Sequence, residues 1–132
     1  MRLWHYKLIP VLPKEMLVSQ WRECIAIRKQ WEKGSLKHRL VNYVMNYDKG
    51  LFNYYARLIV DELVRRKIKL KIAYYVEIDK FCNNEIIKEY YPEHNQRYLD
   101  QCYYNLQEKY DRGIIKNDEW SIIDKLYKNG GE

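Results

Sequence analysis

The sequence has few of the residues that mark a metal site, a disulfide framework or a serine nucleophile. Its three cysteines (Cys24, Cys82 and Cys102) are widely spaced without a CxxC pair, and its three histidines lack the spacing of metal ligands. Serine occurs at only three of 132 positions, and no Gly-x-Ser-x-Gly motif is present. The five glycines form neither a dinucleotide-binding motif nor a P-loop. We therefore expect no disulfide, no metal and no organic cofactor.

The chain also lacks a hydrophobic run long enough to cross a membrane. The apolar stretch at residues 8–13 contains two prolines. It is far shorter than the roughly 20 residues of a membrane helix. The first residues do not have the pattern of a signal peptide. A cytoplasmic protein without membrane contact is the default expectation.

Basic and aromatic residues are abundant by contrast. Residues 1–72 carry 16 Lys or Arg against 6 Asp or Glu, a net charge of +10, whereas residues 73–132 carry 8 against 12, a net charge of −4. There are 14 Tyr and 4 Trp beside 2 Phe. Basic side chains neutralise phosphates and rings stack on bases, which favours a nucleic-acid partner. The alternative is a solvated basic surface, with rings that pack the core and keep their polar tips in water.

Hydrophobic spacing predicts an all-α fold. Over residues 14–32, apolar side chains recur at three- and four-residue steps, and Gly34 ends this helix. A short helix is predicted over 36–47, with Leu40, Val41, Val44 and Met45 facing inward. Asp48 is the expected N-cap of a third helix that continues to about Lys67.

The second half of the chain has a less regular pattern. Residues 68–72 alternate apolar and basic as in a strand, and residues 76–90 also fit a helix. Pro92 suits the first turn of a helix that Gly113 ends, and a last helix is predicted over 118–127. The prolines at 10 and 13 indicate an extended entry to the first helix. We expect one compact domain of about four to six helices over residues 1–128, followed by a mobile tail at 129–132.

Several short motifs in the first half carry a family resemblance through their order and spacing. They are Arg2 next to the N-terminus, Trp21-Arg22-Glu23, Ala26-Ile27-Arg28-Lys29 before Gly34, Tyr47-Asp48-Lys49, and the segment 58–63. Over residues 1–70 the chain resembles the pyrimidine-dimer DNA glycosylases. Its opening Met-Arg-Leu-Trp-His is similar to a bacterial branch of that family.

The resemblance implies an all-α repair enzyme that removes a damaged base from double-stranded DNA and then cuts the abasic strand. The nucleophile in this family is the backbone amine at the N-terminus, which attacks C1′ of the sugar and forms a Schiff base. An α-amino group has a pKa of about 7.7–8.0, against about 10.4 for a lysine side chain. A useful fraction is therefore neutral at pH 7, and the neutral amine is the attacking species.

The resemblance also assigns roles to individual residues. Met1 would supply the amine, because the bulky Arg2 should prevent removal of the initiator methionine. Glu23 matches the catalytic carboxylate, which would stabilise positive charge at C1′ and then assist proton removal from C2′. Arg22 would clamp a phosphate. Arg2 would hold another phosphate, or raise the neutral fraction of the neighbouring amine by charge repulsion.

Two further residues are candidates for DNA contact, each with an alternative. Arg28 corresponds either to a family arginine one turn beyond the glutamate or to a later surface arginine. His5 would orient a phosphate or support the terminus, or it is a hydrogen-bonded structural residue. Without the resemblance, Arg22 and Glu23 would be an ordinary solvated pair. The C-terminal helix offers only Trp120 and Tyr127 as aromatic DNA contacts.

Three functions therefore remain open from the sequence. The first is a monomeric pyrimidine-dimer glycosylase with abasic-site lyase activity. The second is the same fold acting on another lesion. The third is a non-catalytic helical module that binds nucleic acid through its basic half.

Overall fold

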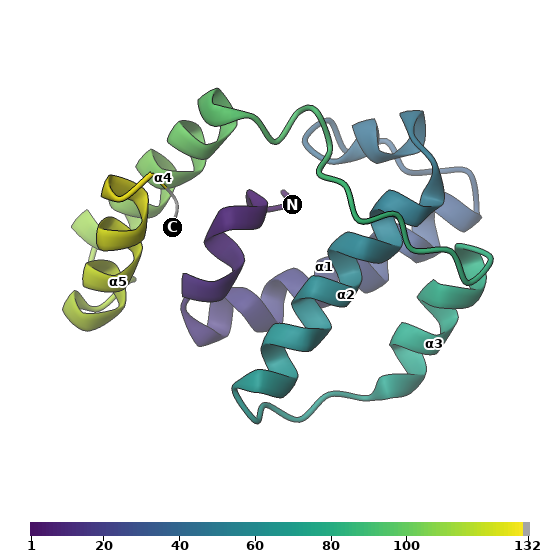
Figure 1. The fold of residues 1–132 in the computed structure, drawn as a ribbon, viewed down its shortest axis with the longest axis horizontal. Coiled ribbons are helices and arrows are strands. Elements are labelled where there is room, and N and C mark those ends of the chain that lie inside the picture. Colours follow the sequence, from purple (N-terminus) through teal and green to yellow (C-terminus); the bar gives the residue numbers. More distant parts are fainter. Residues whose placement is uncertain (131–132) are drawn as a thin grey trace.

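Helices form all of the regular structure in the computed structural model, which describes residues 1–130. This part of the chain contains no strand, so the predicted all-α class is confirmed. The elements are two 3-10 helices, η1 (Tyr6–Val11) and η2 (Asn42–Asn46), and five α-helices, α1 (Lys14–Glu32), α2 (Lys49–Arg65), α3 (Ile72–Phe81), α4 (Gln96–Asp111) and α5 (Asn117–Lys128) (Figure 1).

The helices form two groups that share one core. Helices α1, α2 and α3 pack against one another, and α4 pairs with α5 on the other side of the chain start (Figure 1). The short helix η1 connects the groups, because it contacts both α2 and α5. Buried apolar side chains from every element make one continuous cluster, as expected for a single compact domain. The N-terminus lies in the middle of the molecule between the two groups (Figure 1).

Local sequence explains the two central helices. In α1, Leu17, Trp21 and Cys24 follow one another at three- and four-residue steps and are buried as predicted. Helix α2 begins at the predicted cap, where the Asp48 carboxylate accepts a hydrogen bond from the Gly50 N–H over 2.8 Å. A Cβ at Gly50 would lie 2.6 Å from Cγ1 of Ile87, so close packing requires glycine there.

Two predicted helices are shorter than expected. Only residues 42–46 of the predicted helix 36–47 are helical, as the 3-10 helix η2, and Leu40 and Met45 are exposed rather than inward-facing. Helix α4 begins at Gln96 and not at Pro92, because Asn95 caps it by accepting a hydrogen bond from the Tyr98 N–H.

The predicted strand is absent from the described residues, and the predicted extended entry is limited to Leu12 and Pro13, whose ψ angles are 136° and 147°. Residues 68–71 have no partner strand in the described chain, and a helix begins at Ile72. That helix ends at Phe81, because Asn83 and Asn84 adopt positive φ angles of 56° and 60°, so it does not continue to residue 90. The segment with Pro10 is the 3-10 helix η1.

The last predicted helix is confirmed as α5. Of the predicted tail, residues 131 and 132 lie outside the described residues. None of the helices in residues 1–130 combines the length and the apolar character that crossing a bilayer requires.

Candidate active site at the N-terminus

The first five residues have no regular secondary structure and are held by side chains of the surrounding helices. The Arg2 N–H donates to Oε2 of Glu23 over 3.4 Å. The Arg2 carbonyl accepts from Nε2 of Gln20 over 2.8 Å, and the Trp4 N–H donates to Oε1 of Gln20 over 2.7 Å. Helix α1 therefore fixes the backbone on both sides of Leu3.

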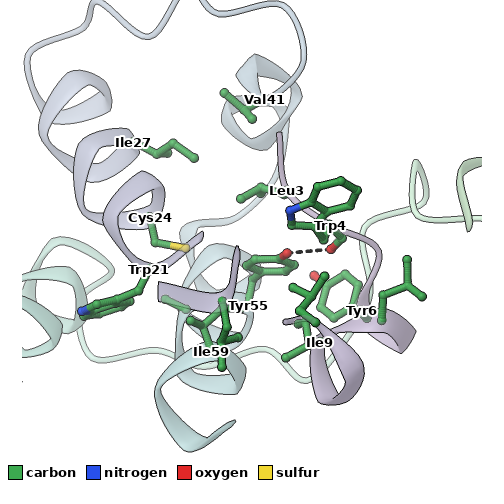
Figure 2. Packing of buried hydrophobic residues seen from close by; sticks show 14 of the residues in the cluster. Leu3, Trp4, Tyr6, Ile9, Trp21, Cys24, Ile27, Val41, Tyr55 and Ile59 are labelled. Carbon is green, nitrogen blue, oxygen red and sulfur yellow. Dashed lines mark hydrogen bonds between the residues drawn. The ribbon is translucent and has the colours of Figure 1, made fainter. Parts of the chain in front are cut away.

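Gln20 connects this segment to the candidate carboxylate. Its side chain is buried, and its Nε2 also donates to Oε2 of Glu23 over 2.9 Å. The hydroxyl of Tyr55, on α2, donates to the Trp4 carbonyl over 2.6 Å (Figure 2) and lies 3.0 Å from Oε1 of Gln20. Two acceptors face Nε2 and the Trp4 N–H donates to Oε1, so the neighbours determine the orientation of the Gln20 amide.

Helix α4 holds the segment from the opposite side. The Tyr98 hydroxyl donates to the Leu3 carbonyl over 2.6 Å. Burial raises the pKa of Tyr98 well above its ordinary value, and the positive charge of Arg2 only partly opposes this effect. The hydroxyl therefore stays protonated and able to donate.

The charges around Glu23 leave the site open to an anionic ligand. Glu23 is half-buried, and Arg22 beside it on α1 is exposed. The Arg2 guanidinium lies 5.5 Å from the centre of the Trp4 ring. Within residues 1–130, neither Arg2, Arg22 nor the Met1 amine has a carboxylate oxygen within 4.0 Å. These cations are available for phosphates.

Arg28 lies in a different environment from Arg2 and Arg22. It is 9% exposed, and its guanidinium bonds Glu77 of α3 over 2.6 Å and Glu32 over 3.4 Å. These contacts join α1 to α3. Nothing in this position supports the predicted DNA contact, and the ion pairs explain the residue as part of the helix packing.

His5 is buried, and both of its ring nitrogens are occupied. Nδ1 accepts a hydrogen bond from the Lys7 N–H, which caps η1, and Nε2 donates to the carbonyl of His94 over 2.9 Å. This arrangement corresponds to the structural alternative for His5. A phosphate contact would require one of these bonds to break.

Part of the basic sequence at the end of α2 is also used inside the protein. Arg65 and Arg66 both bond the Glu62 carboxylate, and Arg66 donates to the Leu12 carbonyl over 2.7 Å. Burial alone would raise the pKa of Glu62, but the two arginines lower it below its usual value. Arg65, Lys67, Lys69 and Lys71 of this basic run are exposed, and within residues 1–130 the three lysines form no ion pair.

The structure thus brings the Arg2 backbone to Glu23, with the Met1 amine one residue away along the chain and more than 4.0 Å from the carboxylate oxygens. It leaves Arg22 exposed and holds Arg28 and His5 in internal contacts. Sequence reasoning missed Gln20, Tyr55 and Tyr98. Gln20 had a signal, because it lies three residues after Leu17 and four before Cys24, on the buried face of α1. No local pattern marks Tyr98.

An all-helical protein with its N-terminal segment held against a carboxylate, and with arginines nearby that have no carboxylate partner within residues 1–130, has the charges that suit a polyanionic ligand. A family model described as pyrimidine dimer DNA glycosylase matches residues 1–76, which is more than half of the chain. The chain belongs to this family of DNA glycosylases, and the family implies a DNA substrate. No curated protein and no solved structure matches the chain.

Proposed function

We propose that this protein excises a damaged base from double-stranded DNA and then cuts the abasic strand, with the Met1 amine as nucleophile. Pyrimidine dimers are the lesion that the family indicates. The protein would act as a monomer and without a metal or organic cofactor.

In the first step, the neutral Met1 amine attacks C1′ of the damaged nucleotide. The new N–C1′ bond replaces the glycosidic bond, and the base leaves with its bonding electrons and takes up a proton. The negative charge of Glu23 stabilises the positive charge that develops at C1′. Opening of the sugar ring gives the imine between Met1 and C1′.

In the second step, the imine makes the C2′ proton acidic. The Glu23 carboxylate accepts that proton, and the electron pair of the C–H bond forms a C2′–C3′ double bond as the 3′-phosphate leaves. Water then hydrolyses the imine and regenerates the amine. The balance requires no oxidant, reductant or metal.

The observation that carries this proposal is the hydrogen bond from the Arg2 N–H to Oε2 of Glu23. The donor of this bond is the residue next to the proposed nucleophile, which supports a reaction in which Met1 and Glu23 act on the same sugar. Arg2 and Arg22 then bind the flanking phosphates, where a guanidinium gives two parallel hydrogen bonds. Exposing C1′ requires a flipped nucleotide, which costs a few kcal/mol and least at a damaged site.

Borohydride trapping tests the proposal directly. The protein is incubated with duplex DNA that contains either an abasic site or a cyclobutane pyrimidine dimer, and the imine is then reduced. We expect a covalent adduct that maps to the N-terminal peptide by mass spectrometry. An adduct on a lysine side chain, or no adduct with either substrate, would overturn the role of Met1.

The same experiment separates the two rival functions. An adduct with abasic DNA but not with the dimer indicates the same chemistry on another lesion. Salt-dependent DNA binding without base release, strand cutting or adduct indicates a non-catalytic binding module. Either result contradicts the proposal as stated.

A further inference from the structure

We propose that Tyr98 is a positioning residue for the reacting amine. Its hydroxyl on α4 holds the Leu3 carbonyl, and together with the bonds from Gln20 and Glu23 this contact sets the path of the backbone that leads to Met1. The inference rests on the proposed function of the N-terminus, and it extends the active site to a helix beyond the residues 1–76 that the family model matches.

The backbone of residues 2–4 is held by side chains of three helices. Gln20 and Glu23 bond Arg2, and Gln20 and Tyr55 bond Trp4, all from α1 and α2. The Leu3 carbonyl lies between these residues and is bonded by Tyr98 over 2.6 Å. Tyr98 is thus the contact from α4 in a set otherwise supplied by α1 and α2.

Among the described residues, the Leu3 carbonyl accepts its hydrogen bond from Tyr98 alone. The Leu3 side chain is completely buried and anchors the residue, but an apolar contact does not determine the rotation of the peptide plane. Without the hydroxyl, the Leu3 carbonyl would lose its bond to Tyr98, and the peptide between Leu3 and Trp4 would be held only through the Trp4 N–H bond to Gln20. Met1 precedes Leu3 by only two peptide units, so a tilt of this less restrained peptide shifts the amine.

Helix α4 is a rigid support for the Tyr98 side chain. Leu99, Cys102 and Leu106 of this helix are buried in the core, and Asn95 caps its first turn. Tyr98 lies in that capped first turn, so its ring is presented from a fixed backbone. Nearby, the His94 carbonyl accepts the hydrogen bond from His5. The segment 94–98 therefore contacts the chain start at two points.

The test compares Tyr98→Phe with Tyr103→Phe. Each variant loses one hydroxyl from a tyrosine of α4, but the Tyr103 hydroxyl donates to Asp124 of α5 over 2.5 Å, away from the N-terminus. The readouts are the single-turnover rate constant for borohydride-trapped adduct on the N-terminal peptide at saturating protein, the Kd for abasic duplex and the thermal midpoint. Both variants should fold, because each loses one hydrogen bond, to the Leu3 carbonyl in Tyr98→Phe and to the Asp124 carboxylate in Tyr103→Phe.

We expect Tyr98→Phe to lower the trapping rate constant about tenfold, since small displacements of a reacting group are costly, while the Kd changes less than about twofold. Both substitutions should lower the thermal midpoint, but Tyr103→Phe should leave the trapping rate constant unchanged. Equal trapping rates in Tyr98→Phe and wild type would overturn the positioning role alone. Absence of an N-terminal adduct in wild type would instead overturn the proposed function, and with it this role.

Discussion

Nε2 of Gln20 donates a hydrogen bond to Oε2 of Glu23 over 2.9 Å, from a side chain that is itself buried. The same Nε2 bonds the Arg2 carbonyl, so one amide connects the proposed carboxylate to the segment that carries the proposed nucleophile. Both the free energy of unfolding and the rate of the proposed reaction should therefore depend on Gln20. The first prediction separates the two effects.

Replacing Gln20 by Met keeps the length of the side chain and removes all of its hydrogen bonds. The buried Trp4 N–H then has no acceptor, and we expect a loss of about 1–3 kcal/mol in the free energy of unfolding. Urea unfolding measures this loss. Trapping at the N-terminus should also slow at temperatures where the variant is fully folded, and a variant as stable as wild type would contradict the described network.

Glu23→Gln should preserve the fold and abolish most of the chemistry. An amide oxygen can still accept from Gln20 and Arg2, but it neither carries negative charge nor takes a proton at neutral pH. We expect strand cutting to fall by about 10²–10⁴-fold, the usual range for general acid–base catalysis. Single-turnover gel assays on abasic duplex measure it, with Glu15→Gln on the exposed face of the same helix as the control. Strand cutting at the wild-type rate would show that another group removes the proton.

Arg22 and Arg28 should respond in opposite ways to substitution. Arg22 is exposed and unpaired among residues 1–130, so Arg22→Ala should reduce the slope of log K against log salt by about one phosphate contact. Arg28→Met should leave that slope unchanged and destabilise the fold by at most about 1 kcal/mol, because it removes ion pairs with Glu77 and Glu32, whose carboxylates are half-exposed. Fluorescence anisotropy at several salt concentrations and urea unfolding give both quantities. A changed slope in Arg28→Met would restore Arg28 as a DNA contact.

The free energy of unfolding should decrease as the pH is lowered, because two histidines are buried in neutral form. Burial, helped by the nearby His5, lowers the pKa of His94 to about 3. Burial also lowers the pKa of His5. Because an unfolded histidine titrates near 6.5, the unfolded chain binds more protons below that pH, and stability is lost as the pH falls from 6.5 toward 3. For His94 alone, the loss between pH 7 and pH 5 is on the order of 2 kcal/mol.

Urea unfolding at pH 7, 6 and 5 checks this dependence. His94→Gln should be less stable at pH 7, since it loses the hydrogen bond between His94 Nε2 and the Tyr43 hydroxyl, but its stability should depend less on pH. His38 is exposed, so His38→Gln should keep the wild-type dependence. The same pH dependence in all three proteins would contradict the prediction.

The parts of the fold that depend on nearby residues were predictable from the sequence. Asp48 caps α2 through a contact two residues away, and the spacing of Leu17, Trp21 and Cys24 predicted the buried face of α1. Arg28 lies on the same helical spacing but was predicted to contact DNA, and its ion pair with Glu77, 49 residues away, has no local signal. The 3-10 helix η1 was not predictable, because Arg66 binds its last carbonyls from more than 50 residues away.

The residues of the candidate site also fall into those that local sequence motifs predict and those that only distant contacts bring to the site. Met1, Arg2, Arg22 and Glu23 lie in short motifs that a family resemblance can identify. Tyr55 and Tyr98 act through backbone carbonyls 51 and 95 residues away, and such contacts require no motif around the tyrosine. The domain boundary at residue 128 stays a prediction, although the buried cluster includes Ile123 of α5.

The contact between Leu3 and Tyr98 has a consequence for synthesis of the protein. Residue 3 leaves the ribosome before most of the chain exists, and the side chain that fixes its carbonyl is made 95 residues later. A nascent chain that ends after α3 already contains Glu23, Arg22 and the whole family-matched region, but its first residues lack their support from α4. We therefore expect the proposed reacting centre to be completed only after α4 has been made, through a contact between distant parts of the chain.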